Sequence, residues 1–274
     1  MLSAFIFPSI SSLPPGYDCR ISIPTARIVN RVAGDADIHC TIKVYCNGQV
    51  LHTEEHDIKI AGGKAVKELP QFVWPDHGEE WNGAAGFAEV SFRSGDGKAV
   101  FTDTGVISFY AIYSKPGKKS FFSDNAFRYG SPPTIDQIAA FGKYVDAYPV
   151  IHLDRKRDLG ETLTLINPYK KAIRAKIVTH DDRELRAKID PESVTNVRLA
   201  GLLNDGENEW IGHLQLIATN RLVTFHIKHS LAQPEIISDH EHLDPFRADP
   251  THFPLTQFLR LKAGELMKRY GWIN

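Results

Sequence analysis

Alternation of apolar and polar residues, rather than helical spacing, dominates the hydrophobic pattern of this chain. The clearest alternating runs are Ile38–Val44, Phe87–Arg93 and Ala172–Val178, and a further strand-like run covers Leu222–His229. Asn47-Gly48 separates two such runs, and this pair is the most typical of a tight hairpin turn. The pattern therefore predicts an all-β protein with antiparallel strands.

The same order of features occurs twice along the chain. Each half has a strand that ends in Asn, an alternating strand, a Lys-Ile pair before a turn, a Trp before a Gly-started strand and a final Ser-Asp pair. These features lie at Asn30 and Asn167, Lys59-Ile60 and Lys188-Ile189, Trp81 and Trp210, and Ser123-Asp124 and Ser238-Asp239. The first half is longer near Gly95 to Gly105, which has the composition of an added hairpin. We predict two tandem antiparallel β-sandwich domains that arose by internal duplication.

Two segments have the spacing of helices instead. Between the halves, Ile135, Ile138, Phe141 and Val145 recur at near-helical intervals, which predicts a short linking helix over residues 134–147. An amphipathic pattern near the end predicts a C-terminal helix over residues 254–274. The expected organisation is a first β-sandwich over 1–133, the linking helix, a second β-sandwich over 148–253 and the terminal helix.

Length, charge and cysteine content narrow the class of protein. A chain of 274 residues fits two domains. Its formal net charge of −1 gives no general attraction to nucleic acid or to an anionic membrane, and we expect neither as a partner. Cys40 and Cys46 lie about 20 Å apart if they share one strand, too far for a disulfide, although Cys19 could pair with either. Three cysteines without a disulfide framework, and the lack of a recognisable secretory signal, favour a cytoplasmic protein.

The best candidate for chemistry is the segment Asp239-His240-Glu241-His242. In an extended strand His240 and His242 point the same way, so their imidazoles can share Zn²⁺ or Fe²⁺, with His252 or Asp244 as a third ligand. The alternative for this segment is a polar connector that caps the sandwich. The possible cofactor is therefore a divalent metal, with Zn²⁺ as the leading choice.

Aromatic residues provide the candidate ligand-binding positions. Trp74 and Trp81 lie in a long loop rich in aromatic and acidic residues, which either covers the edge of the sandwich or forms a binding rim. We add Trp210 and His226 as candidate ligand-binding residues of the second half. No nucleophile motif, catalytic triad or phosphate-binding loop is recognisable, so the chain is more readily explained as a non-catalytic binding or assembly module than as an enzyme. The alternatives are a metal-binding protein or metal-dependent enzyme that uses His240, His242 and His252, and a purely structural subunit.

One family resemblance arises in the second half. It is carried by Leu165–Pro168, Ala172–Ile177, Ile189–Pro191 and Arg221–His226. In these strands and turns the chain resembles bacterial sensory-rhodopsin-transducer-like β-sandwich domains. The resemblance implies a small soluble β-sandwich that binds a ligand or partner and is often oligomeric, and it implies no catalytic residues.

The C-terminal pattern predicts self-association. Large apolar side chains at a chain end are costly to leave in water, and sandwich edges gain from a symmetric partner. We therefore expect a homo-oligomer, most simply a dimer. The side chains expected to contact the sister subunit or the first domain are Phe258, Leu261, Met267 and Trp272.

Overall fold

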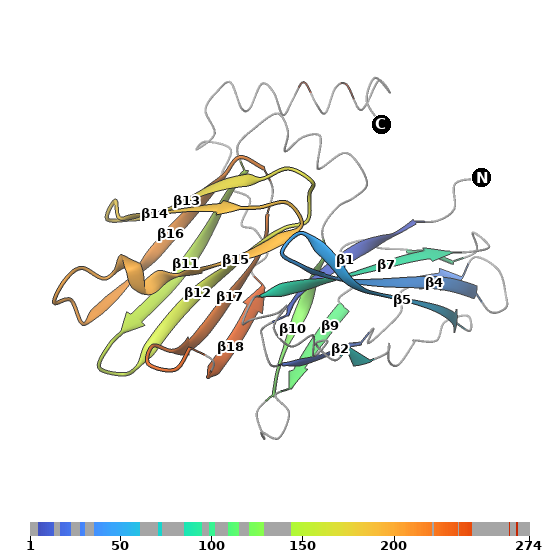
Figure 1. Ribbon diagram of the computed structural model, residues 1–274, viewed down its shortest axis with the longest axis horizontal. Helices are drawn as coiled ribbons and strands as arrows, with labels where there is room; N and C mark the ends of the chain where they lie inside the picture. The colour runs from blue at the N-terminus through green and yellow to red at the C-terminus, as the bar shows by residue number, and fades with distance from the viewer. Residues whose placement is uncertain are drawn as a thin grey trace. The chain divides into compact units, whose positions relative to one another are not determined.

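A computed structural model shows that the described part of the chain consists almost entirely of β-strands and turns, as the alternation predicts (Figure 1). The structure describes residues 5–13, 17–22, 28–30, 36–60, 71–72, 85–94, 99–101, 109–114, 121–128, 144–220, 222–234, 236–242, 263 and 267. The chain divides into two compact units, Met1–Tyr129 and Gly130–Asn274. Among the described residues no helix is long and apolar enough to cross a membrane.

The first unit is built on one eight-stranded sheet. The described strands of the first unit, in chain order, are β1 (Phe5–Leu13), β2 (Asp18–Ser22), β3 (Ile28–Asn30), β4 (Ala36–Cys46), β5 (Gln49–Ile60), β6 (Gln71–Phe72), β7 (Gly86–Ser94), β8 (Ala99–Phe101), β9 (Phe109–Ser114) and β10 (Phe121–Arg128). The strand order is β5-β4-β7-β1-β10-β9-β2-β6, and β3 pairs with β8 separately. The buried side chains include Ile10, Ile42, Val44, Phe87, Val90 and Tyr113.

The second unit separates into two groups of strands. Its elements are β11 (Tyr144–Asp154), β12 (Leu159–Asn167), β13 (Ile173–Thr179), β14 (Glu184–Ile189), β15 (Ser193–Arg198), the 3₁₀ turn η2 (Leu199–Leu202), β16 (Glu209–Ala218), β17 (Val223–Ser230) and β18 (Ile237–His242). Because β11 and β12 pair only at Asp154 and Leu159, the ladders form one group, β14-β13-β16-β11, and another, β15-β12-β17-β18. One buried cluster takes side chains from both groups, including Leu153, Leu163, Leu165, Ile177, Leu214 and Leu216. This arrangement is consistent with a β-sandwich.

The two units contain the same two series of paired strands, but the series are joined differently: β1 pairs with β10 in the first unit, and β11 pairs with β12 in the second. The series β5-β4-β7-β1 corresponds to β14-β13-β16-β11, and β6-β2-β9-β10 corresponds to β15-β12-β17-β18. The first strand of each unit also shifts register at a proline, around Pro8 in β1 and around Pro149 in β11. Proline has no backbone N–H to donate, so within a sheet it is tolerated at such a bulge. The β3–β8 pair has no counterpart among the described strands of the second unit, and β8 lies in the segment predicted as an added hairpin.

The hairpin turn at Asn47-Gly48 and the unpaired cysteines of β4 agree with the sequence predictions. Asn47 and Gly48 form the predicted hairpin turn with φ angles of 48° and 78°. Cys40 and Cys46 are buried, free thiols on β4, as expected for two cysteines along one strand.

The predicted linking helix is wrong over residues 144–147. These residues begin β11, where Val145 pairs with Ile217 of β16. The near-helical spacing that included Val145 was outweighed by this long-range pairing, which a local pattern does not contain. The rest of that helix lies outside the described residues. So does the C-terminal helix except for Ala263 and Met267, which are helical and exposed.

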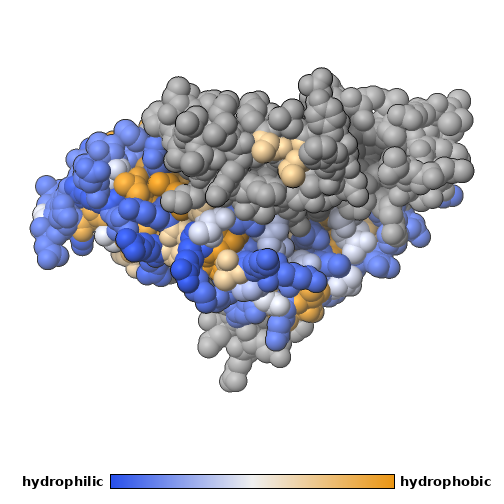
Figure 2. All heavy atoms as spheres, turned by 90° about the horizontal axis from the view of Figure 1, so that it is seen from above, coloured by the Kyte–Doolittle hydropathy of each residue, from blue (hydrophilic) through white to orange (hydrophobic). Residues whose placement is uncertain are grey.

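The coloured part of the surface in Figure 2 is mostly hydrophilic, with hydrophobic side chains in separate patches. The exposed large hydrophobic residues include Val50, Val150, Ile211 and Ile236. Scattered residues of this kind are normal on a folded protein, so their position relative to polar clusters is more informative than their number.

Candidate functional site

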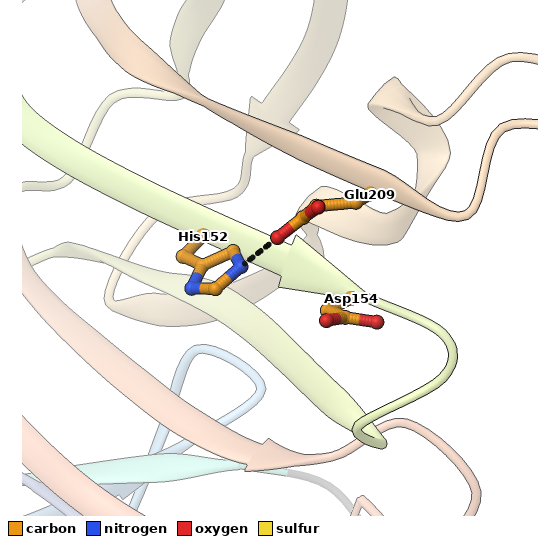
Figure 3. Close-up of side chains that lie close together, drawn as sticks. All are labelled: His152, Asp154 and Glu209. Carbon is orange, nitrogen blue, oxygen red and sulfur yellow. Dashed lines mark hydrogen bonds and ion pairs between the residues drawn. The ribbon is translucent and has the colours of Figure 1, made fainter.

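A cluster of metal-ligand type lies on β11 and β16 and consists of His152, Asp154 and Glu209 (Figure 3). His152 and Asp154 are two residues apart on β11 and therefore project from one face of the strand. Glu209 is directly opposite Asp154 in the β11–β16 ladder, and its Oε1 lies 2.9 Å from His152 Nε2. One ligand atom from each residue lies within 4.8 Å of the others. The sheet pairing thus brings one imidazole and two carboxylates together.

Asp154 is held in place by the turn that follows β11. Its Oδ1 accepts hydrogen bonds from the backbone N–H groups of Lys156 at 2.7 Å and Arg157 at 3.1 Å. Burial acts to raise the pKa of Asp154, but these N–H groups and the Arg157 charge outweigh it and hold the pKa below its usual value. Asp154 is therefore a carboxylate at neutral pH. Its Oδ2, which lies 3.5 Å from Arg157 Nε, is the oxygen with more freedom to bind a cation.

A buried pair anchors the backbone of this cluster from inside the unit. After Leu159 the strand β12 diverges from β11, and the N–H of His152 donates to Glu161 Oε1 at 2.9 Å. The other oxygen, Glu161 Oε2, lies 2.5 Å from His226 Nε2. The side chains of Glu161 and His226 are only 5% and 3% exposed. Glu161 thus satisfies a backbone group at the point where the two strands separate.

The cluster has the donor set of a zinc site, and small movements would give it the spacing of one. Zn²⁺ binds imidazole nitrogen and carboxylate oxygen at about 2.0–2.2 Å, which places two tetrahedral ligands about 3.3–3.6 Å apart. The 2.9 Å contact between His152 and Glu209 would need to open slightly, and the Asp154 carboxylate would need to move inward. The side chains of His152 and Glu209 are 28% and 50% exposed, which leaves room for solvent as a fourth ligand.

Exposed apolar residues adjoin the same cluster. Ile211, directly opposite His152 in the ladder, is 56% exposed, and Val150, two residues before His152, is 64% exposed. Polar ligands beside exposed apolar side chains are a common composition of a binding surface.

Two of the three histidines predicted as metal ligands, His240 and His242, lie on β18. His240 is opposite Ile227 and His242 is opposite Phe225, so both project from one face of the strand. His240 is buried, with its ring 5.0 Å from the ring of Phe225. The side chain of His242 and all of His252 lie outside the described residues. Metal binding by these three histidines stays a prediction.

The predicted ligand-binding residues fall into two groups. Trp74 and Trp81 lie outside the described residues. Trp210 and His226 are buried and belong to the two different groups of strands, on β16 and β17. His226 contacts Glu161, and the Trp210 indole N–H donates to Asp181 Oδ2 at 3.2 Å. Among described contacts, both side chains take part in the internal structure of the second unit.

Trp210 is part of an ionic network between the β13–β14 turn and the residues around the start of β16. The Arg183 guanidinium lies 5.6 Å from the centre of the Trp210 ring, which is a cation–π geometry. Arg183 also binds Asp181 Oδ2 at 2.8 Å and both carboxylate oxygens of Glu207 at 2.6 and 3.0 Å. The network ties the β13–β14 turn to the segment before β16. Gly212 allows this packing, since a Cβ there would lie 2.2 Å from the His180 ring and 2.7 Å from that of Trp210.

This network predicts a loss of stability in acid. The Thr179 hydroxyl, together with the Trp210 indole N–H and Arg183, lowers the pKa of Asp181 to about 2. A carboxyl whose pKa is lowered by folding stabilises the protein above its unfolded pKa of about 3.9 and loses that contribution as the pH falls toward 2. We expect the melting temperature of the wild type to fall more steeply between pH 4 and pH 2 than that of Asp181→Asn, which should be less stable at pH 7. Equal slopes in calorimetry at stepped pH would contradict the assignment.

His152, Asp154 and Glu209 were not among the residues singled out by sequence. His152 and Asp154 alternate within the stretch predicted as the second β-sandwich, but alternation of two polar residues also fits an ordinary strand face. Glu209 is distant in sequence, and only the β11–β16 pairing shows that it lies beside them. Comparison with known protein families and with characterised proteins finds no match to this chain. Its function is therefore inferred from the geometry of the cluster.

Proposed function

We propose that the protein is a non-catalytic binding module and that its second unit holds a divalent transition-metal ion. The observation that carries the proposal is the convergence of His152, Asp154 and Glu209 within 4.8 Å of one another. One imidazole and two carboxylates suit Zn²⁺, with water at the open position. The ion orders the β11–β12 turn beside the exposed Val150 and Ile211, which gives the module a defined surface for its partner.

We propose further that the two units are copies produced by tandem duplication. Their matching series of paired strands and proline bulges support this view. If Pro8 is matched to Pro149, Ser11 takes the place of His152, and the register partner of Leu13, Gly86, takes the place of Glu209. Because serine and glycine provide neither imidazole nor carboxylate, the proposed ion belongs to the second unit alone.

We also propose that the protein forms a homo-oligomer through its C-terminal segment. The helical residue Met267 leaves 37% of its surface exposed in the single chain, which supports a role for the terminal segment in assembly. A dimer that contacts through Phe258, Leu261, Met267 and Trp272, and a cytoplasmic location, stay predictions.

The metal proposal is tested by measuring bound Zn²⁺ after equilibrium dialysis in a chelator-buffered solution. We expect His152→Ala and Glu209→Gln each to weaken binding at this site at least tenfold, because mutations that only disturb the residues around metal ligands already cost 10–100-fold. His213→Ala is the matched control, since His213 is an exposed histidine that projects from the same face of β16 as Glu209.

Two outcomes would contradict this assignment. If His152→Ala binds as much Zn²⁺ as the wild type, the cluster is only a surface hydrogen-bond group. If His240→Ala with His242→Ala removes an equivalent that His152→Ala retains, the β18 segment is the metal site instead.

A further inference from the structure

The first unit carries a group of two histidines and one carboxylate on its edge strand β5, and its ligand atoms lie farther apart than the 4.8 Å that contains those of His152, Asp154 and Glu209. This strand is at the end of the sheet order β5-β4-β7-β1. His52, Glu54 and His56 are spaced two residues apart and therefore project from one face of β5. They are opposite Val44, Ile42 and Cys40 of β4, which are all buried. The three polar side chains thus lie on the face of β5 that continues the buried face of β4.

Both histidines converge on one carboxylate. His52 Nε2 lies 2.6 Å from Glu54 Oε1, and His56 Nε2 lies 3.0 Å from Glu54 Oε2. Partial burial acts to raise the pKa of Glu54, but the hydrogen bonds from His52 and His56 outweigh it and lower the pKa. Glu54 is therefore charged at neutral pH. The side chains of His52, Glu54 and His56 are 42%, 29% and 31% exposed, so solvent and ions can reach them.

The corresponding strand of the second unit, β14, has an apolar residue at the position of His56. Pairing registers match Ile60 of β5 to Ile189 of β14, which places His56 at the position of Leu185. Leu185 packs against the hydrophobic core of the second unit. The first unit therefore has an imidazole where the corresponding strand provides apolar packing.

We propose that His52, Glu54 and His56 form a second site for a divalent transition metal, with two imidazole nitrogens and one carboxylate as ligands. In the metal-bound state the ion lies between the two Nε2 atoms, and the Glu54 carboxylate turns to bind it through one oxygen. Both rings bind in the neutral form with the proton on Nδ1, and water completes the coordination. This donor set suits Zn²⁺. The site is independent of the one proposed on β11 and β16.

Cys40 is the closest thiol in the register, opposite His56, and it is not part of the proposed ligand set. Burial, with a further contribution from the Glu54 charge, raises the pKa of the Cys40 thiol to about 12. It is therefore a neutral thiol in the metal-free protein, and the thiol is a weak metal ligand compared with the thiolate. Binding through nitrogen and oxygen alone predicts that Co²⁺ at this site gives no thiolate charge-transfer absorption.

The test uses the full chain carrying His152→Ala, which removes a ligand of the other proposed site, and measures Zn²⁺ by equilibrium dialysis. We expect this parent to bind one equivalent and to lose it, with affinity lowered at least tenfold, when His52→Ala and His56→Ala are added. His39→Ala is the control, because His39 pairs with Asp57 on the opposite face of the same two strands. If the Ala variant does not fold, as judged by circular dichroism, His52→Gln with His56→Gln replaces it.

Two results would overturn the proposal. One is a parent that folds and binds no Zn²⁺. The other is a histidine-substituted variant that binds Zn²⁺ as tightly as the parent. Both leave the first site unaffected, because that site is judged separately by the difference between the wild type and His152→Ala.

Discussion

Replacing Glu161 with Ala is expected to lower the free energy of unfolding of the second unit by about 2–6 kcal/mol, because two buried polar groups lose their hydrogen-bond acceptor. The carboxylate of Glu161 connects three elements. It accepts the N–H of His152 on β11, contacts His226 Nε2 on β17, and is itself carried by β12. Its loss leaves a buried N–H and a buried imidazole without this acceptor, and unsatisfied buried groups cost about 1–3 kcal/mol each.

Urea unfolding and amide hydrogen exchange in β12 and β17 measure this effect. Glu161→Gln keeps an oxygen for the His152 N–H and should lose much less stability than Glu161→Ala. Glu184→Ala is the matched control, since Glu184 forms ion pairs with Lys176 and Arg186 at the surface. Surface pairs of this kind contribute at most about 1 kcal/mol. Equal losses for Glu161→Ala and Glu184→Ala would show that the buried pair has no special role.

The sequence was most informative where local pattern and tertiary position agree. The alternation at Ile38–Val44 and Phe87–Arg93 lies within β4 and β7, and Asn47-Gly48 forms the expected turn. Alternation works there because one face of each strand is buried and the other is more exposed, so the pleat is visible in the residue types. The Lys-Ile pairs that the sequence places before turns lie at the ends of β5 and β14.

The start of β11 shows where local pattern is insufficient. Val145 fits a helix by spacing and a strand by pairing, and its partner Ile217 is far along the chain. The same limit explains why the candidate site was missed. His152 and Glu209 become neighbours only through the β11–β16 ladder, so no short window of sequence contains both. The histidines of β5 were missed for another reason: their alternation is plain in His52-Thr53-Glu54-Glu55-His56, but it also fits an ordinary polar edge strand.

Asn167 combines a correct sequence signal with a role that only the structure reveals. Sequence analysis identified it as the end of a strand before a turn. In the structure its side chain is fully buried at the end of β12, and its Nδ2 donates to the carbonyl oxygens of Lys171 at 2.8 Å, Ile189 at 3.3 Å and Asp190 at 2.8 Å. Its Oδ1 accepts the N–H of Tyr169 at 3.0 Å. One amide thus satisfies backbone groups of two turns, one after β12 and one after β14.

We therefore expect Asn167→Ala to lower the free energy of unfolding by roughly 3 kcal/mol, since several buried backbone groups lose their partner at once. Asn167→Asp should lose more, although it preserves size, because a carboxylate cannot donate and would direct negative charge at three carbonyl oxygens. Asn196→Ala is the matched control: Asn196 is exposed, and its Oδ1 accepts one bond, from the Thr164 hydroxyl, so its loss should cost less than about 1 kcal/mol. Urea unfolding of the three variants decides the matter. An Asn167→Asp protein as stable as the wild type would mean that the amide's donors contribute nothing to the fold.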